Sequence, residues 1–336
     1  MKAIGYKEPL PITDPNSLLD IEVPAPAPAD HDLLVEIKAV SVNPVDVKVR
    51  ASTRPENGEY KILGWDAAGV VREIGSNVSL FKPGDEVSYA GSIIRPGTNS
   101  EFHLVDERIA GRKPASLSFA EAAAMPLTTI TAWELLFDRL GIVQDASQKS
   151  SLLIMGGAGG VGSILTQLAR KLTSLTIVST ASTPETQKWC RDLGAHYVID
   201  HFQDIAKQLR EIGYAEIEHI ASLAGTHQNY PHLVKVIAPQ GKIGVIDDPP
   251  SLDAMLLKPR CASLHWEYMF ARSVFGTVDM IEQHHLLNQA SELIDRGVIH
   301  TTLAHAAGTI NAANLKRAHE LIESGRAKGK IVLEGF

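Results

Sequence analysis

The spacing of apolar residues changes along the chain, from strand-like patterns at the start to alternating strands and helices in the middle. Residues 32–40 and 69–75 mix alternation with short apolar runs, which predicts strands. Pro83 and Gly84 supply a turn before a further strand from Glu86. Ser118 is expected to begin a helix with Glu121 in a capping box, and a second helix is expected over about 128–140. The N-terminal part is therefore predicted to be β-rich.

From Ser151 onward, strand and helix patterns alternate. Apolar residues recur at helical spacing between 161 and 169. Strands alternating with helices predict a parallel, doubly wound sheet, so the fold class is α/β. A helix at 311–323 and a strand at 330–333 complete the pattern. The predicted buried strands of the middle part are 151–155, 175–179, 197–200, 218–222 and 242–247.

A glycine-rich turn lies between the first of these strands and the helix that follows it. Its fingerprint glycines are Gly157, Gly159 and Gly162, with Gly160 and Val161 between the last two. In such a turn the glycines allow a tight bend, a close approach of the backbone to a pyrophosphate, and close packing of helix on strand. The N-terminus of the helix adds free N–H groups and partial positive charge. The segment therefore predicts a dinucleotide site.

The second strand of this unit bears on the choice between NAD and NADP. NAD-binding proteins place an Asp or Glu about 20 residues after the glycines, where it holds the ribose 2′-hydroxyl. No carboxylate occurs from Gly156 through Pro184. Ser182 and Thr183 are predicted to donate hydrogen bonds to a 2′-phosphate, with positive charge from Lys188 or Lys328. The expected cofactor is NADPH, and NADH remains an alternative.

The charge, the lengths of the apolar stretches and the number of cysteines limit which kinds of partner are expected. The chain of 336 residues carries 32 Lys and Arg against 39 Asp and Glu, a formal net charge of −7, and no basic run. We therefore expect no nucleic-acid partner. No apolar stretch approaches the ~18 residues of a membrane span, and the first residues lack a signal-peptide pattern, so a cytoplasmic protein with no membrane partner is expected. Two cysteines exclude a disulfide framework.

Six motifs follow one another along the chain, namely residues 41–46, 64–71, 82–87, 127–133, the glycine turn, and 325–333. Together they resemble the medium-chain dehydrogenase/reductase superfamily, and within it the quinone oxidoreductase branch often called zinc-type alcohol dehydrogenase-like. The resemblance covers essentially the whole chain. It implies a GroES-like, β-rich catalytic domain at 1–126 and 268–336 and a Rossmann domain at 127–267. It also implies an active site between them, a small-molecule substrate and a homodimer.

The same resemblance raises the question of zinc. Zinc-using members hold the metal through a Cys in the first motif and a Gly-His-Glu in the second. This chain has Asn43 in place of that Cys, and Trp65 and Asp66 in place of the His and Glu. Asn is a poor zinc ligand and Trp is none. The sequence therefore predicts no zinc, although His284, His285 and His265 leave an unorthodox metal site as an alternative.

Candidate catalytic residues lie in the first motif. Asn43 is either a hydrogen-bond partner of a substrate carbonyl or cofactor ribose, or a turn residue before Pro44. The resemblance gives Asp46 a role in orienting a loop. Lys48 is either a proton donor or a solvated lysine on a strand.

Further candidates are expected at the cofactor. Thr131 resembles a threonine that contacts the nicotinamide. The backbones of Ser222 and Ile246, at the carboxyl ends of two parallel strands, are also expected to contact the cofactor.

Three functions follow from these features. The favoured one is NADPH-dependent reduction of quinones or α,β-unsaturated carbonyl compounds without zinc, because the cofactor supplies the hydride. Without a Lewis acid, oxidation of an alcohol is less favoured. The alternatives are a zinc-type alcohol dehydrogenase with unorthodox ligands, and a non-enzymatic protein that binds the cofactor.

Overall fold

The computed structural model of the chain describes residues 1–144, 147 and 149–336. It divides into two units, the first made of Met1–Ile130 and Phe270–Phe336 and the second of Thr131–Met269. Within the described residues, no helix combines the length and the apolar character that crossing a bilayer requires.

The first unit is built on a largely antiparallel sheet. Its strand order, for the residues described, is β15-β16-β3-β5-β6-β8, and β7 also pairs with β3. A smaller sheet has the order β2-β1-β4. The strands are β1 (Lys2–Tyr6), β2 (Leu19–Glu22), β3 (Asp32–Val42), β4 (Lys61–Ile62), β5 (Ala67–Ile74), β6 (Glu86–Tyr89), β7 (Phe102–Asp106), β8 (Ala110–Arg112), β15 (Leu303–Ala306) and β16 (Lys330–Glu334).

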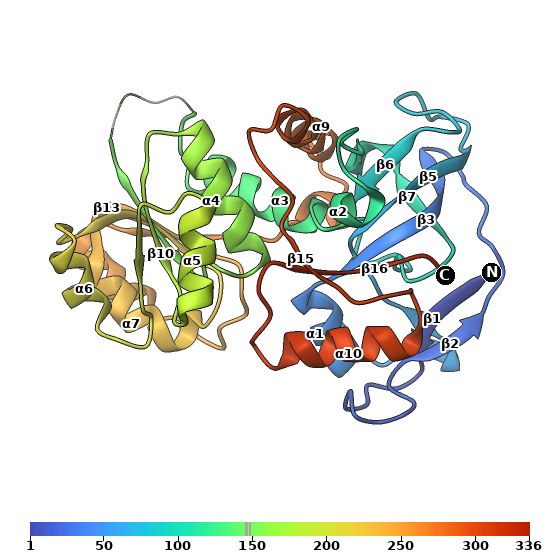
Figure 1. The fold of residues 1–336 in the computed structure, drawn as a ribbon, viewed down its shortest axis with the longest axis horizontal. Helices are drawn as coiled ribbons and strands as arrows, with labels where there is room; N and C mark the ends of the chain where they lie inside the picture. The colour runs from blue at the N-terminus through green and yellow to red at the C-terminus, as the bar shows by residue number, and fades with distance from the viewer. Residues whose placement is uncertain (145–146, 148) are drawn as a thin grey trace. The chain divides into compact units, whose positions relative to one another are not determined.

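The last strand of the chain completes this sheet. β16 runs antiparallel to β3, with Val332 opposite Ser41 and Leu333 opposite Val40 (Figure 1). Both strands are apolar and almost fully buried in the paired region. The sheet is therefore assembled from segments at opposite ends of the sequence.

Helices flank the sheet of the first unit. The predicted capping box is confirmed, because the Ser118 hydroxyl accepts the N–H of Glu121 and the Glu121 carboxylate accepts the N–H of Ser118. The helices are α1 (Pro44–Ser52), α2 (Phe119–Ala123), α3 (Pro126–Trp133), α8 (Ala271–Phe275), α9 (Glu282–Asp295) and α10 (Ala312–Glu323), with 3₁₀ turns at Glu56–Gly58 and Glu107–Ile109.

One local prediction is wrong. Lys48 was expected on a strand, if solvated, but it lies on α1. α1 begins at Pro44 because proline, which has no N–H, loses no hydrogen bond at the first position of a helix. In addition, the Asp46 carboxylate accepts the N–H of Asn43 at 2.7 Å, which satisfies a donor at the helix start.

The second unit is a parallel sheet with the order β11-β10-β9-β12-β13-β14. All its neighbouring strands are parallel, which confirms the predicted doubly wound α/β fold. The strand order reverses between β9 and β12, the position at which such sheets bind ligands. The strands are β9 (Ser151–Met155), β10 (Thr176–Thr180), β11 (Tyr197–Ile199), β12 (Ile217–Ser222), β13 (Ile237–Val245) and β14 (Ser263–Trp266).

Helices pack on this sheet through apolar faces. α4 buries Ile164, Leu165 and Leu168, residues at the predicted helical spacing. The helix predicted over 128–140 begins as α3 and continues as a π-helical segment at Glu134–Arg139. The remaining elements are α4 (Gly160–Leu172), α5 (Pro184–Asp192), α6 (Ile205–Glu211), α7 (Thr226–Val236) and a 3₁₀ helix at Ala254–Arg260.

Candidate functional site

The glycine turn connects β9 to α4, and two of its glycines are required by close packing. A Cβ on Gly157 would lie 2.8 Å from the Cβ of Ser179 on β10. A Cβ on Gly162 would lie 2.4 Å from the backbone oxygen of Gly156. Gly156 itself has a φ of +80°, a conformation that side chains rarely adopt. The turn therefore holds helix and strand closer together than any other residue would allow.

Gly159 differs from Gly157 and Gly162 because a Cβ there would make only an ordinary van der Waals contact. The nearest atom to a Cβ there would be 3.5 Å away. Gly159 is the N-cap of α4 and provides no side-chain cap, and Gly160, Val161 and Gly162 form the first turn. The N–H groups of that turn can therefore bind an anion, assisted by the helix dipole. This geometry fits the pyrophosphate of a dinucleotide.

The end of β10 and the start of α5 carry the residues predicted to meet a 2′-phosphate. Ser182 is half-buried and Thr183 is exposed. The Thr183 hydroxyl caps α5 by accepting the N–H of Thr186 at 3.2 Å. Lys188 is exposed and pairs with Asp192 at 2.7 Å, and an exposed pair of this kind is weak enough for a phosphate to compete with it.

The carboxyl ends of β12 and β13 lie beside each other. The N–H of Ile246 donates to the backbone oxygen of Ser222 at 3.3 Å. The Ser222 hydroxyl lies 2.7 Å from that of Thr226, whose N–H donates to Asp247 at 2.9 Å. Thr131, the first residue of the second unit, is 5% exposed on α3. The structure thus brings Ser222 and Ile246 together at one edge of the sheet.

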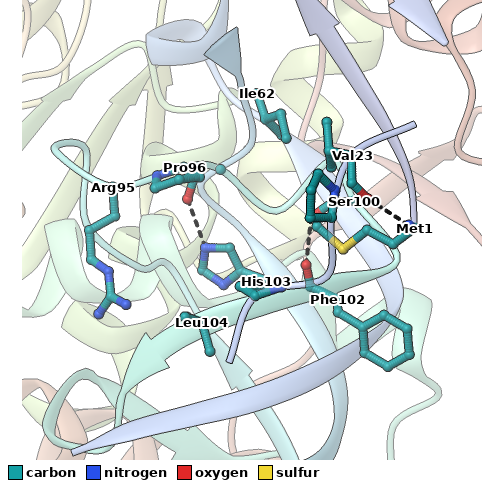
Figure 2. Close-up of a pocket in the computed structure, with 12 residues that line it drawn as sticks. Met1, Val23, Ile62, Arg95, Pro96, Ser100, Phe102, His103 and Leu104 are labelled. Carbon is teal, nitrogen blue, oxygen red and sulfur yellow. Dashed lines mark hydrogen bonds between the residues drawn. The ribbon is translucent and has the colours of Figure 1, made fainter. Parts of the chain in front are cut away.

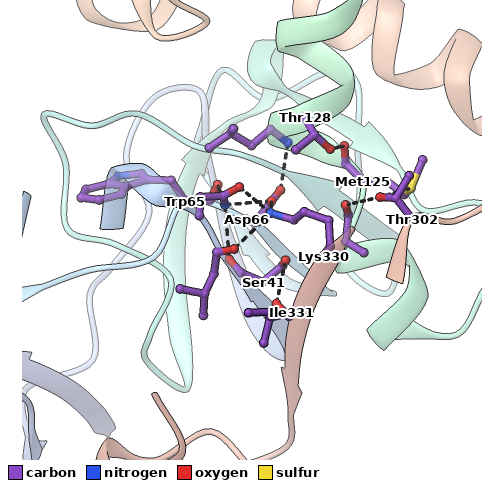
Figure 3. A network of polar contacts seen from close by, with 12 residues as sticks. Ser41, Trp65, Asp66, Met125, Thr128, Thr302, Lys330 and Ile331 are labelled. Carbon is purple, nitrogen blue, oxygen red and sulfur yellow. Dashed lines mark hydrogen bonds and ion pairs between the residues drawn. The ribbon is translucent and has the colours of Figure 1, made fainter. Parts of the chain in front are cut away.

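Three residues of the first unit form a buried polar cluster, here called the Lys330 cluster: Asn43, Asp66 and Lys330. Figure 3 shows Lys330 and Asp66 pointing toward one another. The ammonium of Lys330 donates to Asp66 Oδ2 at 2.9 Å, to the backbone oxygen of Val42 at 3.3 Å and to Asn43 Oδ1. The Asn43 amide donates to Asp66 Oδ2 at 3.0 Å. The three residues are at most 3% exposed.

The carboxylates of Asp66 and of the nearby Asp46 both accept hydrogen bonds from backbone N–H groups. Asp66 Oδ1 accepts the N–H of Leu127 at 2.9 Å, and Asp46 accepts N–H groups of Asn43 and Gly64 at 2.7 and 3.0 Å. Burial raises the pKa of Asp46 to about 7 and also raises the pKa of Asp66, against the opposing effect of the charge on Lys330. Asp46 thereby ties the start of α1 to Gly64.

The other predicted residues of the first unit lie apart from this cluster's hydrogen bonds. Lys48 is exposed on α1, and Lys328 is half-buried just before β16. Asn43 is 1% exposed and its side chain is fully engaged within the cluster. Sequence reasoning assigned no role to Lys330, although a lysine at the head of an apolar strand was a usable signal.

The second unit contains a carboxyl pair that sequence reasoning also missed. Glu134 and Glu267 are at most 3% exposed, and Arg139 donates to them at 3.3 and 2.8 Å. Burial, followed by the neighbouring Glu134, raises the pKa of Glu267 to about 9. The pair therefore holds a proton at neutral pH. The available signal was the carboxylate of Glu134 among the mainly apolar residues 130–137.

The three histidines considered as ligands of an unorthodox metal site each contact other groups. His284 Nδ1 lies 2.7 Å from the backbone oxygen of Ala110, and His265 Nε2 lies 2.8 Å from the Ser263 hydroxyl. His285 lies beside Glu282 on α9. In the part of the chain that the structure describes, no three His, Cys, Asp or Glu side chains gather as metal ligands would.

The residues at the family's zinc positions also match zinc poorly. Zinc prefers Cys, His and carboxylate ligands with free lone pairs. Asn43 and Asp66 instead use their oxygens to accept hydrogen bonds, and Trp65 donates its ring N–H to the backbone oxygen of Ser92 at 3.2 Å. As arranged, this set of side chains does not fit the metal.

A small cavity of about 220 Å³ lies elsewhere in the first unit (Figure 2). Its walls are mainly apolar, and His103 closes one side with Nε2 2.9 Å from the Pro96 oxygen. Burial lowers the pKa of His103 to about 4, so the ring is neutral. The cavity is smaller than typical ligand pockets, and none of the predicted site residues lines it.

Comparison with known proteins agrees with both units. The family "Alcohol dehydrogenase GroES-like domain" matches residues 29–132, and "Zinc-binding dehydrogenase" matches residues 193–333. A zinc-type alcohol dehydrogenase-like protein of Staphylococcus epidermidis is 36% identical over 336 residues, covering 99% of each chain.

Two solved structures are similar over nearly the whole chain. A candidate zinc-dependent alcohol dehydrogenase from Rhizobium etli CFN 42 has a TM-score of 0.97 and 57% identity, covering 100% of this chain and 98% of the other. The quinone oxidoreductase of Escherichia coli, solved with NADPH, has a TM-score of 0.84 and 25% identity, covering 99% and 100%.

A GroES-like unit joined to a Rossmann-type unit with this glycine turn defines the medium-chain dehydrogenase/reductase superfamily, whose members are oxidoreductases. Within that superfamily, the chain belongs to the zinc-type alcohol dehydrogenase-like family.

Proposed function

We propose that the protein reduces quinones or α,β-unsaturated carbonyl compounds with NADPH and without zinc. The observation that carries the proposal is the combination of an intact glycine turn with a Lys330 cluster whose oxygens are all engaged. The similarity to a quinone oxidoreductase solved with NADPH supports the same class of reaction. The first unit would act as the catalytic domain and the second as the cofactor domain.

The cofactor would be held mainly by backbone groups. NADPH, when bound, supplies the hydride. The first turn of α4 binds the pyrophosphate. Ser182, Thr183 and Lys188 bind the 2′-phosphate, since no carboxylate from Gly156 through Pro184 repels it at the end of β10. The residues assigned to cofactor binding are Thr131, Gly157, Gly159, Gly160, Val161, Gly162, Ser182, Thr183, Lys188, Ser222, Ile246 and Lys328.

Reduction of a C=C or quinone acceptor also needs a proton. Lys48 is the proposed donor because it is exposed on α1, four residues from the N-terminal proline of that helix. Asp46 holds the start of α1 and thereby positions Lys48. The engagement of Asn43 with Lys330 and Asp66 favours a structural role for that residue.

The test is a turnover assay with purified protein. NADPH consumption is followed with quinones, enones, aldehydes and alcohols, each with and without added zinc or a chelator. Turnover of quinones or enones that is indifferent to both additions is expected. Turnover of alcohols that is lost with a chelator would instead indicate a zinc dehydrogenase, and cofactor binding without any turnover would indicate a non-enzymatic role.

The proposed proton donor has its own test. Lys48→Met should lower kcat more than NADPH affinity and remove the alkaline limb of the pH profile that a lysine donor produces. Lys207→Met, an exposed lysine of α6, is the matched control and should leave both unchanged. An unaltered pH profile in Lys48→Met would assign the proton to another group.

We further propose a homodimer. β14 is the terminal strand of its sheet, and apolar side chains lie exposed on and near it, including Trp266 and Tyr268. An edge strand with exposed aromatic residues is a surface that a second copy can pair with. Light scattering of the purified protein should give twice the chain mass of 36.4 kDa, and Trp266→Lys should shift it to the monomer.

A further inference from the structure

The Lys330 cluster is the meeting point of several elements of the first unit. Lys330 begins β16, while Val42 ends β3 and Asn43 precedes α1. Asp66 immediately precedes β5 and also accepts the first available N–H of α3, that of Leu127. The ammonium therefore links three segments, its own and those at residues 42–43 and at Asp66, and it does so out of contact with water.

Hydrogen-bond accounting shows that the cluster is complete. Asp66 accepts one N–H on Oδ1 and two on Oδ2, and Asn43 Oδ1 accepts Lys330. No side-chain polar atom of Asn43, Asp66 or Lys330 is among the buried atoms that lack a partner. The formal charges of Asp66 and Lys330 cancel. The cluster thus needs no further ligand to satisfy its polar groups.

We infer that the ammonium of Lys330 is the resident cation of this constellation, in the place where the family name implies a metal, and that it keeps divalent metal out. A divalent ion would have to displace the ammonium from Asp66 and Asn43 and would then lie beside a buried positive charge. The displaced ammonium would then be a buried charge without a partner, which destabilises the folded protein. The inference deepens the zinc-free part of the proposed function and rests on it, and it holds whichever acceptor is reduced.

Removing the amine should expose an oxygen-lined vacancy. Lys330→Ala deletes three methylene groups and the ammonium, while Asp66 Oδ2, Asn43 Oδ1 and the Val42 oxygen stay. Because a buried carboxylate loses its counter-ion, the midpoint of thermal unfolding should fall by on the order of 10 °C. Lys207→Ala, at an exposed ion pair, is the matched control and should change it little.

Chemical rescue then separates charge from packing. n-Propylammonium matches the deleted atoms, and n-propanol has nearly the same shape without the charge. We expect n-propylammonium to reverse a substantial part of the decrease in the unfolding midpoint of Lys330→Ala and to have no effect on Lys207→Ala. n-Propanol should reverse little of that decrease. Equal rescue by both compounds, or by neither, would overturn the role of Lys330 as the cation.

A second pair of variants keeps the inference testable if Lys330→Ala does not fold. Lys330→Met preserves the length of the side chain and leaves Asp66 without its counter-ion. Adding Asp66→Asn to Lys330→Met should then raise the unfolding midpoint, because the uncompensated charge is removed. A further decrease in the double variant would contradict the inference.

Metal content tests the exclusion directly and does not depend on turnover. Protein produced in zinc-supplemented medium and dialysed without chelator should contain far less than one zinc per chain by elemental mass spectrometry. One zinc per chain that Asp66→Asn or Asn43→Ala abolishes would overturn the inference. Because none of these measurements involves an acceptor, failure of the proposed reductase activity would leave their outcome unchanged.

Discussion

The carboxylate of Asp66 accepts the backbone N–H of Leu127 at 2.9 Å, so a residue preceding β5 caps the first turn of α3. The other oxygen of the same carboxylate binds Lys330. α3 begins in the first unit, and Thr131, two residues before its end, is the first residue of the second unit. Asp66 therefore fixes the starting point of the helix that leads the chain into the second unit.

Asp66→Ala should be strongly destabilising. It leaves the buried Lys330 without its counter-ion and the N–H of Leu127 without an acceptor. Loss of one partner of a buried ion pair costs about 3–5 kcal/mol. Denaturant unfolding would measure the loss, and Glu211→Gln at an exposed pair should cost less than about 0.5 kcal/mol. A similar small loss in both variants would show that the Asp66 network contributes little.

Gly162→Ala should impair folding, whereas Gly159→Ala should impair only the binding of NADPH. The first places a Cβ 2.4 Å from the Gly156 oxygen and should disrupt the packing of α4 on β9. The second adds a Cβ at ordinary contact distance, 3.5 Å from the Gly156 oxygen, at a φ of −72° that alanine adopts without strain. We therefore expect Gly159→Ala to fold normally but to bind NADPH roughly tenfold more weakly, a loss of about 1.4 kcal/mol.

Thermal unfolding and fluorescence titration with NADPH would separate the two effects. If Gly159→Ala bound NADPH as well as the unmodified protein does, the phosphates would not approach the backbone there.

Ser182→Asp should change the preference between cofactors. A carboxylate at this half-buried position repels a 2′-phosphate and can hold a ribose 2′-hydroxyl. The dissociation constant for NADPH should rise by about tenfold or more, while that for NADH stays the same or falls. Ser182→Asn is the uncharged control. A parallel change for both cofactors would place the 2′-phosphate elsewhere.

The carboxyl pair predicts a pH dependence of stability. The pKa of Glu267 is raised from 4.5 to about 9, so the folded state holds a proton that the unfolded state releases above pH 4.5. This contribution is fully present below pH 4.5 and declines as pH rises toward 9, by roughly 1 kcal/mol per pH unit. Glu267→Gln, which is neutral at every pH, should flatten that slope.

Denaturant unfolding between pH 5 and pH 9 would measure the slope, with Glu211→Gln as the control. Equal slopes in Glu267→Gln and the unmodified protein would mean that the pair binds no extra proton on folding.

Local patterns predicted the elements whose signals are contained in a few neighbouring residues. The apolar run at β9, the helical spacing from Val161 and the glycines between them give the cofactor turn, because backbone geometry there depends on adjacent residues. The capping box at Ser118 is equally local. α1 was missed because an Asn-Pro pair followed by alternating Val residues resembles a strand as much as a helix.

The features that the sequence did not predict, the Lys330 cluster and the pair of Glu134 and Glu267, depend on contacts between residues far apart in the chain. Lys330 and Asp66 are separated by 264 positions, and Glu267 and Arg139 by 128. No periodicity connects such residues, since only the completed sheets bring them together. The sequence motif contained Lys330, but its function as the partner of Asn43 and Asp66 depends on the register between β16 and β3.

The pairing of β16 with β3 also has a consequence for synthesis on the ribosome. The second unit is a continuous stretch of chain, so it can fold as soon as residue 269 has emerged. The sheet of the first unit is complete only once β16 is available, and until then Asp66 lacks its counter-ion and Asn43 Oδ1 lacks its donor. The N-terminal segment is therefore made first and finished last, which makes it the part of a nascent chain most in need of protection from aggregation.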